Sequence, residues 1–537
     1  MKRRPRVESA QLPVRAVLAT LTTVLAALLA PAARAEEPSS RAFLKTSLVF
    51  IYGDDDVLHA PADSVPASPA SGAGDRPGYA PLFEGYTSRY TGRENWSELD
   101  LDGFAPGFVR GLTTRARLAL ALDASSLGMR STPVVIEDVG SFIETAWTFG
   151  HAALERPDAL TLRVFPLNAD RERVGELEAL GWGGAVGPNW ESPYATASGP
   201  VRAARLELAA GVFQLHAALK TASFVETAAT GPAVAETSYG AFGGVASRTS
   251  APLAVALEVG HFEYGRLPGG ASAPRATTTG ASLRVRAGVG LVEPEPPTGF
   301  GMERSPFDTS APFAEDAGGD TEQPNAKNPP KTQAFAVAVE TAHLLERLWD
   351  FDHPGATALA SARAVAVVAE ARWSFIDVRA LFTVRNPEFV LRNGSGAFAA
   401  QTLPRAAQEG SEVGLAAGIA LTIARCLRPS VGVGVLRPAF VTTQAVDALG
   451  QPTGATLVLH APNDVESLPP GAAPVPVFEL RPGFDVRVSS LLQALLWVQY
   501  RRDFNHTRLV AAEGGALARG FRAPDRLGYG VAARAVW

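Results

Sequence analysis

The most constraining feature of this sequence is an alternation of apolar and polar residues that recurs along the whole chain. In ASLRVRAGVGL (281–291), Leu283, Val285 and Val289 share one parity, whereas Arg284 and Arg286 share the other. Successive side chains of a β-strand point to opposite faces, so this pattern predicts a strand with one apolar and one polar face. A period of two repeated this often is hard to obtain from helices, and the sequence therefore predicts an all-β fold. Clear examples are 113–123, 158–165, 377–385 and 478–488.

Seventeen segments can be interpreted as strands in this way. One stretch, 336–351, is ambiguous, because Leu344, Leu345, Leu348 and Trp349 also follow the spacing of an amphipathic helix. Besides those above, the segments lie near 43–52, 141–149, 203–220, 238–247, 253–264, 333–342, 363–376, 411–425, 431–441, 455–460, 492–503 and 528–537.

Alternation alone does not separate a soluble sandwich from a membrane barrel. In a barrel the apolar face meets lipid and the polar face lines the lumen, whereas in a sandwich the apolar face is the core. The polar parity of the strands repeatedly carries arginine in mid-strand. A water-filled lumen accommodates such charges, although a solvated sheet face does so too. If the protein is a barrel, the candidate pore-lining residues are Arg115, Arg117, Arg163, Arg284, Arg286, Arg379 and Arg487.

The end of the chain, GYGVAARAVW (528–537), favours the barrel. Tyr529 and Trp537 share a face and are separated by about 26 Å of strand, or roughly 20 Å along the membrane normal at a tilt of about 40°. Each ring is therefore expected at a lipid–water interface, with Val531, Ala533 and Ala535 covering the hydrocarbon between them.

This final strand resembles the C-terminal signature of Gram-negative outer-membrane β-barrel proteins, which the barrel-assembly machinery reads. The resemblance implies a closed antiparallel barrel in outer-membrane lipid, porin-like, that passes small hydrophilic solutes or ions. Because a closed barrel has no free edge, 43–52 is expected to pair with 528–537. The chain length predicts about 16 strands, within 14–18, and such a barrel encloses an aqueous channel unless something plugs it. The alternatives are a plugged barrel with a structural or adhesive role, and a secreted soluble β-protein.

The first 35 residues are typical of a secretory signal peptide. Basic residues precede a 15-residue apolar run, Ala16 to Ala30, and small residues surround Arg34. The segment carries six basic residues and one acid, so its removal changes the net charge from −5 to −10. An acidic chain of this kind argues against nucleic acid as a partner. We therefore expect residues 36–537 to form a single barrel domain.

Two long connections, 53–95 and 292–332, are rich in proline, glycine and acids. One of them could fold inward, so that its carboxylates face the lumen arginines across a constriction. The alternative is a solvated surface loop. The triplet Asp54, Asp55 and Asp56 could hold a divalent cation, but it lacks the regular spacing of a calcium loop and a solvated turn is favoured.

An enzyme is the rival class. A barrel hydrolase needs a histidine with a carboxylate, amide or serine partner near one rim. The eight histidines are scattered, and only His59, near the aspartate triplet, and His506, near Asp503 and Asn505, lie beside such partners. The sequence therefore predicts no catalytic residue, no cofactor and no metal. The single cysteine, Cys426, is interpreted as a small apolar residue of a strand.

Overall fold

The computed structural model describes most of residues 42–537. Outside the description lie residues 1–41, 55, 59–92, 108, 124–134, 139, 150–157, 170–171, 176, 178–179, 184–194, 199–200, 228–232, 248–252, 267–274, 290–333, 354, 374, 392–400, 424–425, 445–453, 462–463, 490 and 512–516.

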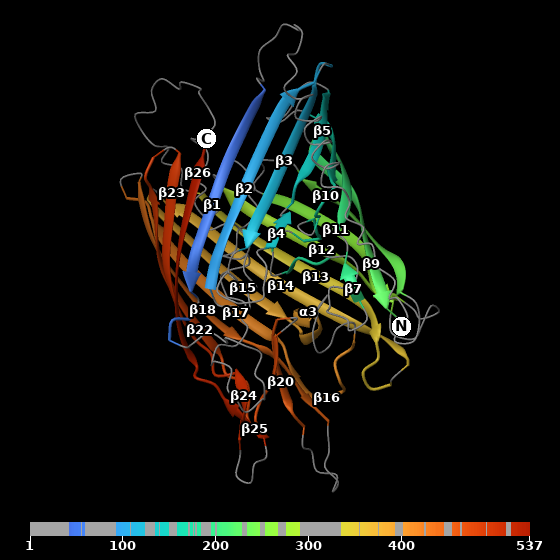
Figure 1. Ribbon diagram of the computed structural model, residues 1–537, viewed down its shortest axis with the longest axis vertical. Helices are drawn as coiled ribbons and strands as arrows, with labels where there is room; N and C mark the ends of the chain where they lie inside the picture. Colours follow the sequence, from blue (N-terminus) through green and yellow to red (C-terminus); the bar gives the residue numbers. More distant parts are fainter. Residues whose placement is uncertain are drawn as a thin grey trace, which may run out of the picture.

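Antiparallel strands form a closed ring (Figure 1). Within the described residues the ring has 18 strands. They are β1 (Phe43–Asp54), β2 (Arg93–Pro106), β3 (Leu112–Asp123), β5 (Phe142–Phe149), β6 (Asp158–Phe165), β8 (Arg202–Ala210), β9 (Phe213–Thr227), β10 (Ala233–Ser247), β11 (Leu253–Arg266), β12 (Arg275–Val289), β13 (Ala334–Trp349), β14 (Thr357–Trp373), β15 (Ile376–Arg385), β17 (Glu412–Leu421), β18 (Leu427–Arg437), β22 (Val477–Arg487), β23 (Leu492–Arg502) and β26 (Asp525–Val536). Two short strands extend it, with β4 (Val135–Asp138) pairing with β3 and β7 (Ala195–Ser198) with β9.

The first and last strands close the ring. β1 pairs with β26 in a register that sets Ser47 opposite Val536 and Asp54 opposite Tyr529. The backbone N–H of Thr46 donates to the carbonyl of Trp537 at 2.8 Å, and the N–H of Trp537 donates back at 3.0 Å. The pairing expected between 43–52 and 528–537 is confirmed. A closed ring satisfies every ladder and leaves no edge facing lipid.

The strand number is 18, so the expected value of about 16 was too low although its range reached 18. Three local features relate the seventeen segments interpreted as strands to the 18 strands of the ring. Residues 203–220 form two strands, β8 and β9, which turn at Gly211 with a φ of 55°. β2 was not recognised, and residues 455–460 form β20, which lies outside the ring. The ambiguous stretch 336–351 lies almost wholly in strand β13 and forms no helix.

The two faces of the wall differ as the alternation predicts. On β12, Leu283 and Val285 are 42% and 37% exposed, whereas Arg284 and Arg286 are 7% and 8% exposed. Outward apolar residues of neighbouring strands, most of them exposed, lie side by side in register, so they form a continuous apolar belt on the outer face. Around Val285 this belt runs through Val255, Val339, Val367, Phe382, Leu415, Val435 and Phe478.

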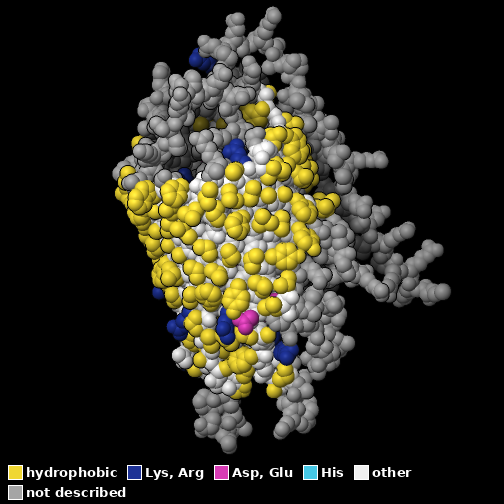
Figure 2. Space-filling view, turned by 90° about the vertical axis from the view of Figure 1, so that its left-hand side faces the viewer, with side chains coloured by type: hydrophobic (Ala, Val, Ile, Leu, Met, Phe, Trp, Pro, Cys, Tyr) yellow, Lys and Arg dark blue, Asp and Glu magenta, His cyan; other side chains and the backbone are white. Residues whose placement is uncertain are grey.

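Figure 2 shows this apolar surface on one side of the barrel, where charged side chains lie only towards the two ends. Tyr529 and Trp537 face outward and are 39% and 59% exposed. An apolar band of this kind around a closed ring defines the class of transmembrane β-barrels. Among the described residues, no helix is long and apolar enough to cross a bilayer.

The two ends of the barrel differ. We call the end at which β26 finishes the Trp537 end, and the opposite one the loop end. The connections that lead into additional strands all leave the loop end, at the bottom of Figure 1. These elements are the helix α3 (Pro387–Leu391), a four-stranded sheet of β16 (Ala406–Gly410), β19 (Ala439–Thr443), β20 (Thr456–Ala461) and β21 (Asp464–Ser467), and a hairpin of β24 (Thr507–Ala511) and β25 (Leu517–Phe521). Cys426 lies exposed in the turn before β18, and its interpretation as a strand residue was wrong.

Candidate functional site in the barrel lumen

Charged side chains of opposite sign face one another across the inner wall. On β3, the Arg115 Nε donates to Asp102 Oδ1 of β2 at 2.8 Å, and the Arg117 Nη2 lies 2.6 Å from Asp100 Oδ2. The two pairs occupy successive inward positions of adjacent strands, so they form a ladder along the wall. Cross-strand pairs of this kind stabilise a sheet and leave each arginine close to electrically balanced.

The same pairing continues around the wall. The Arg163 Nε donates to Glu144 Oε2 at 2.7 Å, and the guanidinium lies over the ring of Phe142, with its Cζ 4.8 Å from the ring centroid. On β15, the Arg379 Nε lies 3.6 Å from Glu370 Oε1 of β14. These arginines therefore share the inner wall with as many carboxylates, which the sequence analysis did not identify.

Arg284, Arg286 and Arg487 complete the set of predicted arginines. Arg284 and Arg286 are buried on the inward parity of β12, and Arg284 is the register partner of Glu340 on β13. Arg487 is half-buried at the end of β22. The seven predicted arginines thus lie on five strands around the inner wall, β3, β6, β12, β15 and β22, and do not converge on one point.

A segment that connects β6 to β8 folds into the lumen. Its described part, within 166–183, places Val174, Leu177, Leu180 and Trp182 in the main apolar cluster, each no more than 2% exposed. Val174 and Trp182 exchange two backbone hydrogen bonds of 3.0 Å, which close the segment into a loop. We call residues 166–183 the lumen segment. Its apolar side chains hold it against the inner faces of β9–β14, where the Trp182 ring meets that of Phe262 edge to face at 5.5 Å.

Polar anchors satisfy the backbone of the lumen segment. The N–H of Gly175 donates to Glu258 Oε2 at 2.6 Å, and the N–H of Leu177 donates to Glu340 Oε2 at 3.0 Å. The indole Nε1–H of Trp182 donates to Ser282 Oγ at 3.0 Å. A backbone group that enters a protein interior without a partner costs about 1–3 kcal/mol, so these wall acceptors determine where the segment can dock.

A glycine and a lysine fix the two ends of the docked loop. Gly183 has a φ of 73°, and a Cβ there would lie 2.2 Å from the Phe262 ring, so only glycine fits. The Lys220 ammonium, on β9, donates to the carbonyls of Glu172 at 2.5 Å and Gly183 at 3.1 Å. One wall lysine therefore holds the loop on both sides of the Val174–Trp182 pair.

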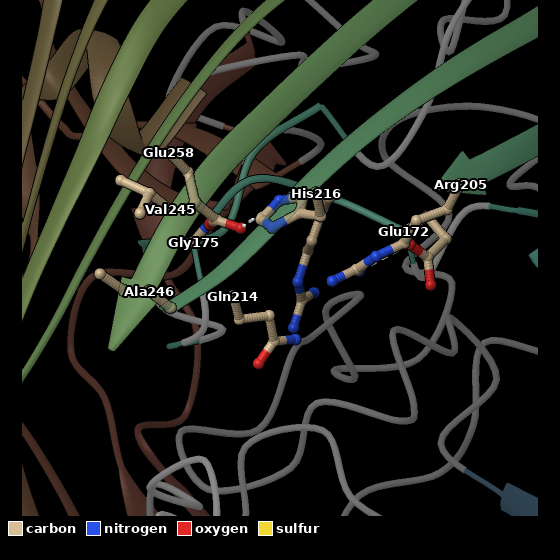
Figure 3. Close-up of a pocket in the computed structure, with 10 residues that line it drawn as sticks. Glu172, Gly175, Arg205, Gln214, His216, Val245, Ala246 and Glu258 are labelled. Carbon is tan, nitrogen blue, oxygen red and sulfur yellow. Dashed lines mark hydrogen bonds and ion pairs between the residues drawn. The ribbon is translucent and has the colours of Figure 1, made fainter. Parts of the chain in front are cut away.

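Between the lumen segment and the wall lies a polar cavity of about 290 Å³. Figure 3 shows its charged lining, in which Arg205 and Glu172 point toward one another, as do His216 and Glu258. The Arg205 Nη1 lies 3.1 Å from Glu172 Oε2, and the His216 Nε2 lies 3.0 Å from Glu258 Oε1. The cavity is thus lined by both basic and acidic side chains, which offer hydrogen-bond donors and acceptors to a bound solute.

A second element reaches the same apolar cluster. Asn386 caps α3, because its side-chain oxygen accepts the N–H of Phe389 at 3.1 Å, and it also accepts the N–H of Arg363 on β14 at 2.8 Å. Pro387 follows as the first helical residue, which suits its fixed φ. Phe389 is fully buried beside the inward alanines of β14. Two connections from the loop end therefore narrow the lumen.

The inward-folding connection considered from the sequence was one of two other segments, 53–95 or 292–332. The connection 292–332 lies outside the described residues, as do 59–92 of the connection 53–95. Of the aspartate triplet, Asp56 is buried and accepts the N–H of Leu58 at 3.1 Å. The lumen segment and its anchors were not anticipated. The available signal was a set of apolar residues, Val174, Leu177, Leu180 and Trp182, spaced without a period of two inside a connection.

Comparison with known proteins gives matches to solved structures at low sequence identity. No family model matches the sequence, and no curated protein matches it. Among solved structures, OccK8 (OprE) of Pseudomonas aeruginosa is 8% identical with a TM-score of 0.44, over 92% of this chain and 98% of that one. OpdK of the same organism, solved with vanillate, is 10% identical with a TM-score of 0.40, over 92% and 99%. An anion-selective porin from Comamonas acidovorans is 10% identical with a TM-score of 0.37, over 93% and 100%. The assignment to the transmembrane β-barrels therefore rests on the ring closure and the apolar belt of this chain.

Proposed function

We propose that this protein is an outer-membrane channel through which small hydrophilic solutes or ions diffuse passively. One observation carries the proposal: an 18-stranded closed ring with an apolar exterior encloses a charged lumen that an anchored inward segment narrows. Barrels of 16–18 strands are wide enough to hold an aqueous channel. The narrowing then sets which solutes pass.

The surroundings of the channel follow from the same proposal. Residues 1–35 act as the signal peptide, residues 36–537 form one barrel domain in outer-membrane lipid, and the barrel-assembly machinery inserts it. The seven predicted arginines line the solute path together with their partner carboxylates. Paired charges of both signs favour polar solutes in general over ions of one sign.

Conductance in planar lipid bilayers tests the proposal. We expect refolded protein to give stable single-channel steps, and Trp182→Ala to raise the step size because it removes the largest apolar anchor of the lumen segment. Glu258→Gln should increase open-channel noise, since it weakens the acceptor of the Gly175 N–H. The matched control is Glu263→Gln, on the same strand but on the outer face, where Glu263 pairs with Arg275.

A barrel that inserts but never conducts would overturn the proposal. That result would favour a plugged barrel, in which the lumen segment and α3 close the path completely. Insertion is checked separately, by heat-modifiable mobility in gel electrophoresis and by co-sedimentation with the lipid.

A further inference from the structure

A cluster of histidines and carboxylates lies at the loop end, away from the lumen cavity. His460 comes from β20 in the four-stranded sheet, whereas Asp503 and His506 lie in the short stretch between β23 and β24. The three side chains are 6%, 1% and 2% exposed. A strand of the four-stranded sheet and a connection that is distant in sequence therefore meet at one buried point.

Potential ligand atoms of the three residues lie close to one another. One potential ligand atom from each of the three residues lies within 4.8 Å of the other two. The His506 Nε2 lies 3.3 Å from Asp503 Oδ2, and the His460 Nδ1 lies 3.9 Å from the same oxygen. The two imidazole rings are stacked, with centroids 4.6 Å apart.

Neighbouring residues orient Asp503. Its Oδ1 accepts two hydrogen bonds of 2.9 Å from Asn505, one from the backbone N–H and one from the side-chain amide. Asn505 is itself held by Val475, whose N–H it accepts at 2.8 Å. The second oxygen, Oδ2, therefore faces the histidines and the Arg501 Nη2, which lies at 2.9 Å.

Glu466 of β21 stands behind His506. Its Oε1 lies 3.6 Å from His506 Nδ1, and its Oε2 accepts the hydroxyl of Thr507 at 2.8 Å. A carboxylate on the far nitrogen of a histidine fixes the ring and its tautomer, which is the usual arrangement behind a metal-bound imidazole. The other nitrogen of His506, Nε2, is the one that points to Asp503.

We propose that His460, Asp503 and His506 bind one divalent transition-metal ion, with Zn²⁺ as the best match. Two imidazole nitrogens and a carboxylate oxygen are ligands that Zn²⁺ accepts, with bonds of about 2.0–2.2 Å. Tetrahedral bonds of that length place ligand atoms roughly 3.3 Å apart, so the His506–Asp503 distance already fits. The His460 Nδ1 lies 3.9 Å from the same carboxylate oxygen, and the His460 ring must turn out of its stack with His506 so that both imidazole nitrogens point at one ion. The bound ion joins β20 to the stretch before β24, and so holds the four-stranded sheet to the rim of the barrel.

This inference does not depend on whether the barrel conducts. It also departs from the sequence analysis, which expected no metal. The ligands come from two segments more than 40 residues apart, so no short spacing pattern reveals them. The competing interpretation is a buried ion-pair network, in which Arg501 and the histidines balance Asp503 and Glu466 without a metal.

Metal titration of the refolded full chain in detergent tests the proposal. Protein stripped with a chelator is titrated with Zn²⁺ against a chromophoric competitor, and one equivalent should bind. His460→Ala and His506→Ala should each weaken binding at least about 100-fold, and Glu466→Gln about 10- to 100-fold, since it keeps the shape but loses the charge behind His506. The matched control is His353→Ala, which removes a histidine paired with Asp350 at the same end of the barrel and should leave Zn²⁺ binding unchanged.

Spectroscopy on the wild-type protein gives an independent readout. One equivalent of Cu²⁺ should give an electron paramagnetic resonance spectrum with coupling to two imidazole nitrogens. Failure to bind Zn²⁺ in the stripped wild type would establish the ion-pair network instead. Equal affinity in all variants would show adventitious surface binding, and both results overturn the proposal even if a variant fails to refold.

Discussion

Replacing Val285 by arginine tests which solvent the outer face meets. Val285 is the central outward residue of the apolar end of β12, and its register partners Val255 and Val339 are exposed too. An arginine at the midplane of a membrane barrel costs about 2–4 kcal/mol, which is roughly a 30- to 700-fold loss in the ratio of folded to unfolded protein. We expect Val285→Arg to lower the free energy of unfolding by that amount.

A matched control lies on the same face of the same strand. Thr277 is eight residues from Val285, about 26 Å along the strand and roughly 20 Å along the membrane normal. Its register partners are Glu263 and Arg347, so it lies at the polar end of the outer face. Thr277→Arg should cost only about 0–1 kcal/mol.

The assay is reversible folding into lipid vesicles under guanidinium titration, followed by tryptophan fluorescence. The two variants carry the same added charge on one face of one strand, so their difference isolates depth in the bilayer. Equal costs for both, or a cost below about 1 kcal/mol for Val285→Arg, would refute a lipid-facing belt centred on Val285.

Two further perturbations test the last strand and the arginines of the inner wall. Deleting Trp537 removes an outward ring and two backbone hydrogen bonds to Thr46, so we expect the deleted chain to accumulate in the periplasm and be degraded. The Trp537→Phe variant keeps an aromatic ring and should remain in the outer membrane. Normal outer-membrane levels of the deletion variant would contradict the assembly role of this residue. Changing Arg284 and Arg286 together to glutamate leaves Glu340 beside added negative charge, so the reversal potential in a salt gradient should move toward cation preference and the shift should shrink as salt rises. Arg347→Glu, on the outer face, is the control, and an unmoved potential in the double variant would place these arginines outside the conducting path.

The lipid-facing residues could be predicted from the sequence because the alternation that identifies them is visible within each strand. Every second residue of a strand contacts lipid, so a few alternating positions on β12 are enough to predict that Leu283 and Val285 face outward. The last strand is equally clear, since Tyr529 and Trp537 carry both parity and aromatic character. The same reasoning resolves 336–351, where Leu344 is buried and its neighbour Leu345 is 49% exposed, as in a strand.

The lumen-facing residues were harder to predict because their interaction partners lie on other strands. β2 was missed since its inward positions carry Glu98, Asp100 and Asp102, which by themselves are typical of a solvated loop. Their role becomes clear only in the paired strands, where Arg117 and Arg115 of β3 form ion pairs with them. A strand whose polar face is satisfied by another strand cannot be recognised from its own composition.

The lumen segment shows the same limit in a connection. The connections 53–95 and 292–332 were considered as inward loops because they are rich in acidic residues, yet charge by itself predicts only contact with water. A segment that docks inside a barrel also needs apolar side chains, and here Leu177 and Trp182 supply them. Its anchors are distant, since the acceptor of the Leu177 N–H is Glu340, 163 residues further along the chain. Apolar residues without a period of two, inside a connection between two clear strands, are therefore the better sequence signal for a constriction. Acceptors such as Glu258 and Glu340 become its anchors only when the closed ring brings them opposite it.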